Sequence, residues 1–300
     1  MRLDAETFND PDLIAYAKEN FIAYHLNVDS ADGDALADSF NIRGIPSFVF
    51  VDEEGNEVDR IVGFMPPEEY LAEMKRIREG VGTIPDLMSK LDVDPENADV
   101  IKALAGKLEA MGGLSAAISY WEMLFEMKDV DATTQSLANL KMALFHSQEN
   151  NDPEMLKSFI ANETNTEVLP DAHSALRNYY RKQGDKEAEA EAYRRFVDFM
   201  SGLNKETPGF LNGYAWRMTQ LEMNLENALE RIDQAIAMFD ENYDDRDRAQ
   251  IKDTRAEVLW KLNRIDAAVA EIDECIALQP EDKYYQEQKD KFLNTEQPEA

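Results

Sequence analysis

The sequence predicts a mixed fold, in which a short α/β segment is followed by a long all-α region of repeated helix pairs. In the first 80 residues, two apolar runs rich in β-branched and aromatic residues stand among helical segments, and turn residues follow the second run. From about residue 81 onward, apolar residues recur at helical spacing, and small residues recur at matching places. At 300 residues the chain also exceeds one ordinary domain.

Charge and composition exclude several classes of protein. Lys and Arg total 31 against 61 Asp and Glu, so the formal net charge is -30, while 44% of the residues are apolar. Such a surface repels phosphate backbones and anionic membranes, and we expect no nucleic-acid partner. No apolar run reaches the roughly 18 residues that a membrane span needs. The acidic excess would also suit a high-salt habitat, which stays an open alternative.

The elements of the α/β segment follow from local signals. Asn9-Asp10-Pro11 combines a capping side chain with a first-turn proline and opens a helix that ends near Asn20. Residues 21–28 are predicted to form a buried strand, followed by a helix through Phe40. Pro46 leads a second strand, where its missing N–H does least harm. A hairpin turn, a return strand and a last helix are expected at residues 52–56, 57–63 and 66–77.

Two stretches of this segment resemble a known family. "LDAETFNDPDLIAYAKENFIAYHLNVDS" resembles the part that follows the active-site cysteines in bacterial thioredoxin-like proteins, and "FNIRGIPSFVFVDEEGNEVDRIVGF" resembles their segment around the cis-proline. The most specific part is Arg43-Gly44-Ile45-Pro46. The resemblance implies a thioredoxin-like domain over residues 1–80, a cis Ile45–Pro46 bond, and a peptide-contacting loop made of Gly44, Ile45 and Pro46.

The sequence lacks two parts of the family's pattern. By the resemblance, the C-x-x-C motif and the first strand would lie ahead of Met1, and residues 1–80 contain no cysteine. Because a thiolate is the nucleophile of thiol–disulfide exchange, we expect the chain as given to be redox-inactive. Three explanations of the missing strand stay open: the sequence is a fragment, the remaining strands close into a smaller sheet, or a partner donates a strand.

Beyond an expected linker at residues 81–96, the region 97–293 contains internal repeats. "ALAGKLEAMGGLSAAISYWEMLFEM" and "RAEVLWKLNRIDAAVAEIDECIALQP" have small or turn-forming residues at the same internal spacing: Ala105, Gly112 and Ala117 in the first, and Ala256, Asn263 and Ala268 in the second. Small residues at these places allow two antiparallel helices to pack closely, and Gly112 or Asn263 suits the turn between them.

This pattern resembles tetratricopeptide (TPR) repeats, whose period is about 34 residues. The resemblance implies about five helix pairs and a polar capping helix, with the pair between Asp131 and Ile160 inferred from its position alone. We expect a disordered tail at residues 294–300.

Other conspicuous residues are interpreted as structural, and no metal or cofactor is expected. Cys275 falls where the repeat has a small residue at a helix contact, so we expect it to be buried. The histidines lack metal-ligand spacing, and the acidic loop lacks the alternation and closing glutamate of a calcium site. These residues are His25, His146 and His173, and Asp29, Asp32 and Asp34.

The aromatic residues of the helical region are expected mostly to pack between helices. Any that line a concave groove would serve as peptide anchors. The candidates are Tyr120, Trp121, Tyr179, Tyr180, Tyr214, Trp216 and Trp260.

We therefore expect a protein- or peptide-binding protein that acts through a helical groove and the loop of Gly44, Ile45 and Pro46. The alternative is a fragment of an extracytoplasmic thiol–disulfide oxidoreductase whose C-x-x-C lies upstream of Met1. The expected location depends on the same alternatives. It is cytoplasmic if Met1 is the true start, and periplasmic or secreted if a signal peptide is missing. The partner's identity and the oligomeric state are left open.

Overall fold

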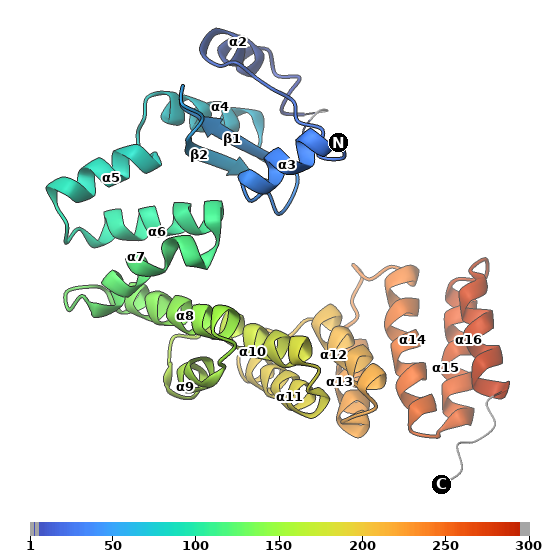
Figure 1. Cartoon of the computed structure of the whole chain (residues 1–300). Coiled ribbons are helices and arrows are strands. Elements are labelled where there is room, and N and C mark those ends of the chain that lie inside the picture. Colours follow the sequence, from blue (N-terminus) through green and yellow to red (C-terminus); the bar gives the residue numbers. More distant parts are fainter. Residues whose placement is uncertain (1–2, 4–5, 295–300) are drawn as a thin grey trace. The chain divides into compact units, whose positions relative to one another are not determined.

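The computed structural model describes residue 3 and residues 6–294 (Figure 1). Apart from Asn294, the tail expected at residues 294–300 lies outside the described residues. The chain divides into two compact units, Met1–Met155 and Leu156–Ala300. The first unit holds the α/β elements and the first helices of the helical region, and the second unit holds the later helices.

The α/β elements begin where the capping and turn signals place them. Their bounds are α2 (Pro11–Asn20), α3 (Ala31–Ser39), β1 (Ser47–Val51), β2 (Glu57–Val62) and α4 (Pro67–Arg78). The side chain of Asp10 accepts hydrogen bonds from the backbone N–H groups of Asp12 and Leu13, so it caps α2. The hydroxyl oxygen of Ser30 accepts from the Gly33 N–H and caps α3 in the same way.

Strands β1 and β2 form an antiparallel hairpin whose register pairs Ser47 with Val62. One face of the hairpin packs on helices α2 and α4 and forms a small core. In that core, Phe48 meets Phe8 and Tyr70 edge to face, with ring centroids 5.4 and 5.3 Å apart. Burial raises the pKa of Tyr70.

The prediction of a strand at residues 21–28 is wrong. Within the described residues the sheet consists of β1 and β2, and residues 21–27 belong to neither a helix nor a strand. Ile22 and Tyr24 are 102% and 80% exposed, whereas Phe21 packs on Phe50 with ring centroids 5.4 Å apart. An apolar run becomes a strand only when a neighbouring strand accepts its ladder hydrogen bonds, and neither described strand pairs with this run.

The range 81–96, expected as a linker, contains helix α5 (Ile84–Val93). Thr83 precedes this helix and Pro85 stands in its first turn, which is a favourable place for proline. Ile84 and Leu87 are buried against Leu104 of the following helix, so this range is packed structure rather than a spacer.

The helical region continues with eleven helices in the described residues. Their bounds are α6 (Ala98–Gly112), α7 (Leu114–Glu126), α8 (Ala132–Glu149), α9 (Glu154–Asn162), α10 (Leu169–Gln183), α11 (Lys186–Gly202), α12 (Pro208–Leu221), α13 (Leu225–Ala237), α14 (Asp245–Lys261), α15 (Ile265–Leu278) and α16 (Lys283–Asn294). Four consecutive pairs pack on each other, namely α6 with α7, α10 with α11, α12 with α13, and α14 with α15 (Figure 1). Helices α8 and α9, in the range where a pair was inferred from position alone, are not among these packed pairs.

The small residues at the helix crossings are buried as expected. Ala105, Ala117, Ala256 and Ala268 are all 0% exposed. Asn263 occupies the turn between α14 and α15 with φ +58°, a left-handed conformation that asparagine tolerates. In the other pair Gly113, not Gly112, takes the positive φ of +75°.

The second unit has one main apolar core, to which α11 through α16 contribute. Its largest fully buried side chains include Tyr214, Met218, Ile232, Ile272 and Phe292. Tyr285 and Phe292 of α16 close this core, which fits the expected capping helix. Among the described helices, none combines the length and the apolar character that a membrane crossing requires.

Candidate functional site

The three predicted site residues lie together in the loop between α3 and β1. Helix α3 ends where the Asn41 and Ile42 N–H groups bond to the Asp38 and Ala37 carbonyls, both at 2.9 Å. Gly44, Ile45 and Pro46 follow and lead directly into β1. The peptide bond between Ile45 and Pro46 is cis.

Within this loop the side chain of Ile45 is 67% exposed. The loop is held on both sides of Ile45, because the Ser47 hydroxyl donates to the Gly44 carbonyl at 2.7 Å and the Gly63 N–H donates to the Pro46 carbonyl at 2.9 Å. Ile45 is thus an exposed apolar residue on a backbone that hydrogen bonds hold on both sides.

Strand β1 has one unpaired edge among the described residues. The hydrogen bond from the Gly63 N–H to the Pro46 carbonyl shows that the backbone of Pro46 faces β2. Because backbone groups alternate sides along a strand, Phe48 and Phe50 also face β2. The N–H and C=O groups of Ser47, Val49 and Val51 therefore point to the other side, where no described strand pairs with them. Such an edge is a template for an added strand.

Two apolar side chains of the hairpin, one on β1 and one on β2, are exposed. Val51 and Val62 lie on the hairpin face opposite the α2–α4 core and are 48% and 60% exposed. Isolated exposed apolar residues are ordinary, but here they accompany Ile45 and an unpaired edge. The hairpin thus offers both backbone hydrogen bonds and apolar contacts.

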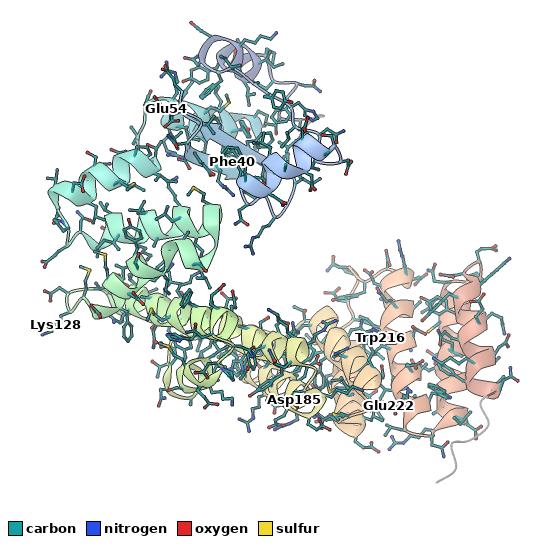
Figure 2. All side chains as sticks on the ribbon, viewed as in Figure 1. Phe40, Glu54, Lys128, Asp185, Trp216 and Glu222 are labelled. Carbon is teal, nitrogen blue, oxygen red and sulfur yellow. The ribbon has the colours of Figure 1, made fainter. Side chains whose placement is uncertain are left out.

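The loop is also anchored to helix α6, which sequence reasoning missed. Asn41 Nδ2 donates to the Met111 carbonyl at 2.9 Å, and Arg60 Nη1 donates to the Ala110 carbonyl at 2.9 Å. Arg60 Nη2 also donates to the carbonyl of Phe40, which is labelled in Figure 2, at 2.8 Å. The available signal was the last turn of α6, which has no basic residue of its own to satisfy its carbonyls.

A second polar contact joins the hairpin to the helices. The carboxylate of Asp59 accepts from Arg76 of α4 at 2.8 Å and from Lys107 of α6 at 2.6 and 2.8 Å. Its side chain is only 3% exposed, so two cations compensate one buried anion. Asp59 therefore supports the relative positions of β2, α4 and α6 rather than a reaction.

The one cysteine of the sequence, the residue type that could act as a nucleophile, lies outside this loop. Cys275 is on α15, fully buried, and its thiol donates to the Ala249 carbonyl at 3.3 Å. Burial raises the pKa of Cys275 to about 12, so it is held as a thiol. Its expected role as a small buried residue is confirmed.

The remaining polar candidates do not come together. His25 is exposed, and His146 contacts Asn150. His173 stacks with Phe196 and with Phe199, and burial lowers its pKa. Within the described part of the chain, no group of three potential His, Cys, Asp or Glu ligands could hold a metal ion. Of the acidic residues considered for calcium, Asp32 and Asp34 lie in the first turn of α3, which Ser30 caps.

The aromatic candidates of the helical region divide by exposure. Trp121 and Tyr214 are 2% and 0% exposed and belong to the cores. Trp216, labelled on α12 in Figure 2, is 39% exposed. It shares one face of α12 with Gly209, Gly213 and Gln220, which are exposed as well.

Comparison with known proteins gives the class of the first segment. Residues 1–78 match the family model described as a thioredoxin-like domain. The chain therefore combines a thioredoxin-like α/β part with a region of repeated helix pairs.

Among curated relatives, the chain is 38% identical over 66 residues to the thioredoxin-like protein HCF164, chloroplastic, of Oryza sativa subsp. japonica. It is 28% identical over 75 residues to the thiol:disulfide interchange protein DsbD of Tatumella citrea. These matches cover 22% and 24% of this chain, and only 24% and 13% of the two relatives.

Solved structures similar to the chain include TPR proteins. YrrB, described as a TPR protein with an unusual peptide-binding site, has 15% identity and a TM-score of 0.45, over 68% of this chain and 97% of its own. BtubC (BKLC) from P. vanneervenii has 14% identity and a TM-score of 0.42, over 72% of this chain and 92% of its own.

Proposed function

We propose that this chain binds extended polypeptide segments at the loop of Gly44, Ile45 and Pro46 and along the unpaired edge of β1. The observation that carries the proposal is the set of unpaired backbone groups at Ser47, Val49 and Val51, next to the exposed Ile45. A strand added at such an edge gains affinity from main-chain hydrogen bonds and selectivity from alternate side chains. In the chain as given, no cysteine lies in the thioredoxin-like part, so the site binds without exchanging disulfides.

The ligand class follows from the same features. An extended segment with alternating apolar residues would place them against Ile45 and the exposed valines of the hairpin. With a net charge of -30 on the chain, a segment with basic residues between the apolar ones is favoured over an acidic one. A suitable probe is a labelled ten-residue peptide of alternating valine and lysine.

Residue-resolved amide hydrogen exchange tests this proposal. In the free protein, we expect the Phe48 and Phe50 amides to be protected by β2, and those of Ser47, Val49 and Val51 to exchange faster. Added probe peptide should slow exchange at these three positions alone. Equal slowing at all five positions, or none at any, would contradict pairing at this edge.

A substitution at the loop gives an independent measurement. Ile45→Asp should weaken binding of the probe by about tenfold or more, since an apolar contact of this size contributes about 1.5–3 kcal/mol when fully buried. Leu293→Asp is the matched control, because Leu293 on α16 is also exposed, at 56%, and the charge change is the same. Titration in about 0.15 M salt limits general attraction of the basic peptide. Equal losses in both variants would argue against the site.

The helical region is proposed to hold a second part of the partner. Trp216 is an exposed aromatic residue on a helix face that is otherwise small or polar, which suits a partner side chain laid across the glycines. Its indole N–H resonance, followed in a titration with the isolated partner, would shift if this face is used. A partner that binds while leaving this resonance unchanged would place the contact elsewhere.

A second candidate function is thiol–disulfide exchange by a longer protein. It is favoured by the similarity of residues 1–78 to thioredoxin-like domains and to the thiol:disulfide interchange protein. Reading the coding sequence upstream of Met1 in frame tests it. A strand followed by C-x-x-C and a signal peptide would support an extracytoplasmic oxidoreductase, and an in-frame stop codon directly before Met1 would remove that candidate.

A further inference from the structure

The end of helix α6 has an unusual cap, which comes from the thioredoxin-like part. The last carbonyl groups of a helix lack partners within the helix. In α6, Glu109 O accepts from the Gly113 N–H, while the Ala110 and Met111 carbonyls accept from Arg60 and Asn41. The negative end of the α6 dipole also favours the guanidinium of Arg60.

The same two side chains hold the start of the loop that carries Ile45. Asn41 stands at the first loop position with φ +50°, and its Oδ1 accepts from Arg43 Nε at 3.0 Å. Arg60 bridges the Phe40 carbonyl to α6 and makes a bidentate ion pair with Glu57. The side chains of Arg60 and Glu57 are 8% and 4% exposed, so solvent does not replace these contacts.

We infer that Asn41 and Arg60 are positioning residues for the peptide-contact loop, and that the end of helix α6 supports the peptide site through them. This inference rests on the proposed function. The carbonyls of α6 fix the backbone from Phe40 to Arg43, and this segment sets the position of Ile45 beside the edge of β1. Loosening the cap therefore loosens the loop, and the loop in turn orders the end of α6.

Asn41→Gly in the full chain tests the inference without forcing the backbone, because glycine accepts the positive φ. Two amides report on the anchor: Ile42 N–H, bonded to Ala37, and Gly113 N–H, bonded to Glu109. Both should exchange about fivefold faster, as expected for the loss of one neutral hydrogen bond. The Asp34 amide, bonded to Ser30 at the other end of α3, should not change.

Asn204→Gly is the matched control, since Asn204 also has a positive φ, of +52°, and lies in the second unit. Arg60→Lys is the second variant: its ammonium keeps the charge beside Glu57 but loses the planar fork that spans two carbonyls. Both Asn41→Gly and Arg60→Lys should raise the dissociation constant of the alternating valine–lysine peptide by about fivefold, while Asn204→Gly leaves it unchanged.

The two readouts separate this inference from the proposed function. If the wild-type chain does not bind the peptide, the proposed function fails, and the exchange of Ile42 and Gly113 still decides whether α6 anchors the loop. Unchanged exchange at both amides in both variants would overturn the inference. Faster exchange with unchanged peptide affinity would overturn it as well, because the cap would then be structural only.

Discussion

Asp253 is a carboxylate that the packing of α14 and α16 has removed from water. It is 8% exposed, and its Oδ2 accepts a 3.1 Å hydrogen bond from the Tyr284 hydroxyl. Burial raises the pKa of Asp253 to about 6; the Tyr284 bond and Lys291 act against this rise, and Glu257 adds to it. The folded state thus keeps a proton that the unfolded state releases at lower pH.

The sign of the pH dependence follows from this raised pKa. The contribution of Asp253 to the free energy of unfolding is fully present below about pH 4 and is lost as the pH rises through about 6. Asp253→Asn should therefore raise the free energy of unfolding by about 1–3 kcal/mol at pH 7.5 and change it little at pH 4. Urea unfolding at the two pH values measures it. Asp273→Asn, at an exposed site on α15, is the control, and equal effects at both pH values would contradict the prediction.

Cys275 illustrates a residue whose role depends on its burial. Its thiol lies at the contact of α14 and α15 and donates to a backbone carbonyl, so it fills space as a small side chain. With its pKa raised to about 12, it does not form the thiolate that disulfide exchange needs.

At the scale of elements, the helix pairs depend on small residues where two helices cross. Ala268 on α15 is 0% exposed, whereas Ala270 two residues later is exposed. Ala268→Leu should lower the free energy of unfolding by about 1–3 kcal/mol, because extra methylenes at a packed crossing force the helices apart. Ala270→Leu on the same helix should change it by less than about 0.5 kcal/mol. Chemical denaturation of the two variants compares them, and similar losses would argue against close packing at Ala268.

The hairpin and α6 form the other element-scale feature. Asp59, Arg60 and Asn41 connect β2 and the loop to α6 and satisfy groups that these elements leave unpaired. The boundary expected near residue 80 is thus crossed by buried polar contacts. In the first unit, the thioredoxin-like part and the first helices are one packed structure.

At the scale of the whole molecule, the acidic excess is the dominant property. Within the described residues, some basic side chains pair with two acidic ones, as Arg255 does with Asp233 and Glu271. The whole chain has a net charge of -30, so its excess acidic residues repel one another in the compact state. Salt shortens the range of that repulsion to about 8 Å at 0.15 M.

We therefore expect the thermal midpoint to rise by a few degrees as sodium chloride increases from about 0.02 to 0.5 M. Differential scanning calorimetry measures the midpoint, and potassium chloride at the same concentrations controls for effects specific to one cation. A midpoint that stays constant or falls would show that local ion pairs outweigh the net charge. It would also count against a surface adapted to high salt.

The predictable part of the fold consists of features with local causes. The cap at Asp10, the hairpin at residues 52–56 and the buried alanines at the helix crossings all follow from residues close in sequence. The two wrong predictions, the strand at residues 21–28 and the linker at residues 81–96, depend instead on which elements lie beside these residues in the fold. Residues 21–28 have the composition of a strand but no described partner, and residues 81–96 look like a linker until Ile84 and Leu87 meet α6.

The candidate site divides in the same way. The resemblance located Gly44, Ile45 and Pro46, because this short run is specific. It did not show Asn41 and Arg60, whose partners lie 70 and 50 residues away along the chain. Their acceptors are backbone carbonyls, so the identities of residues 110 and 111 do not mark them as partners.

By itself, the sequence determined the two-part organisation, the repeat of helix pairs, the acidic surface and the lack of cysteine in the thioredoxin-like part. These follow from composition, periodicity and short motifs, which act locally or are simply additive. The tertiary structure decided which apolar run becomes a strand, where packing continues through the expected linker, and what holds the loop beside β1. Each of these depends on groups distant in sequence that satisfy one another's hydrogen bonds only after the chain has folded.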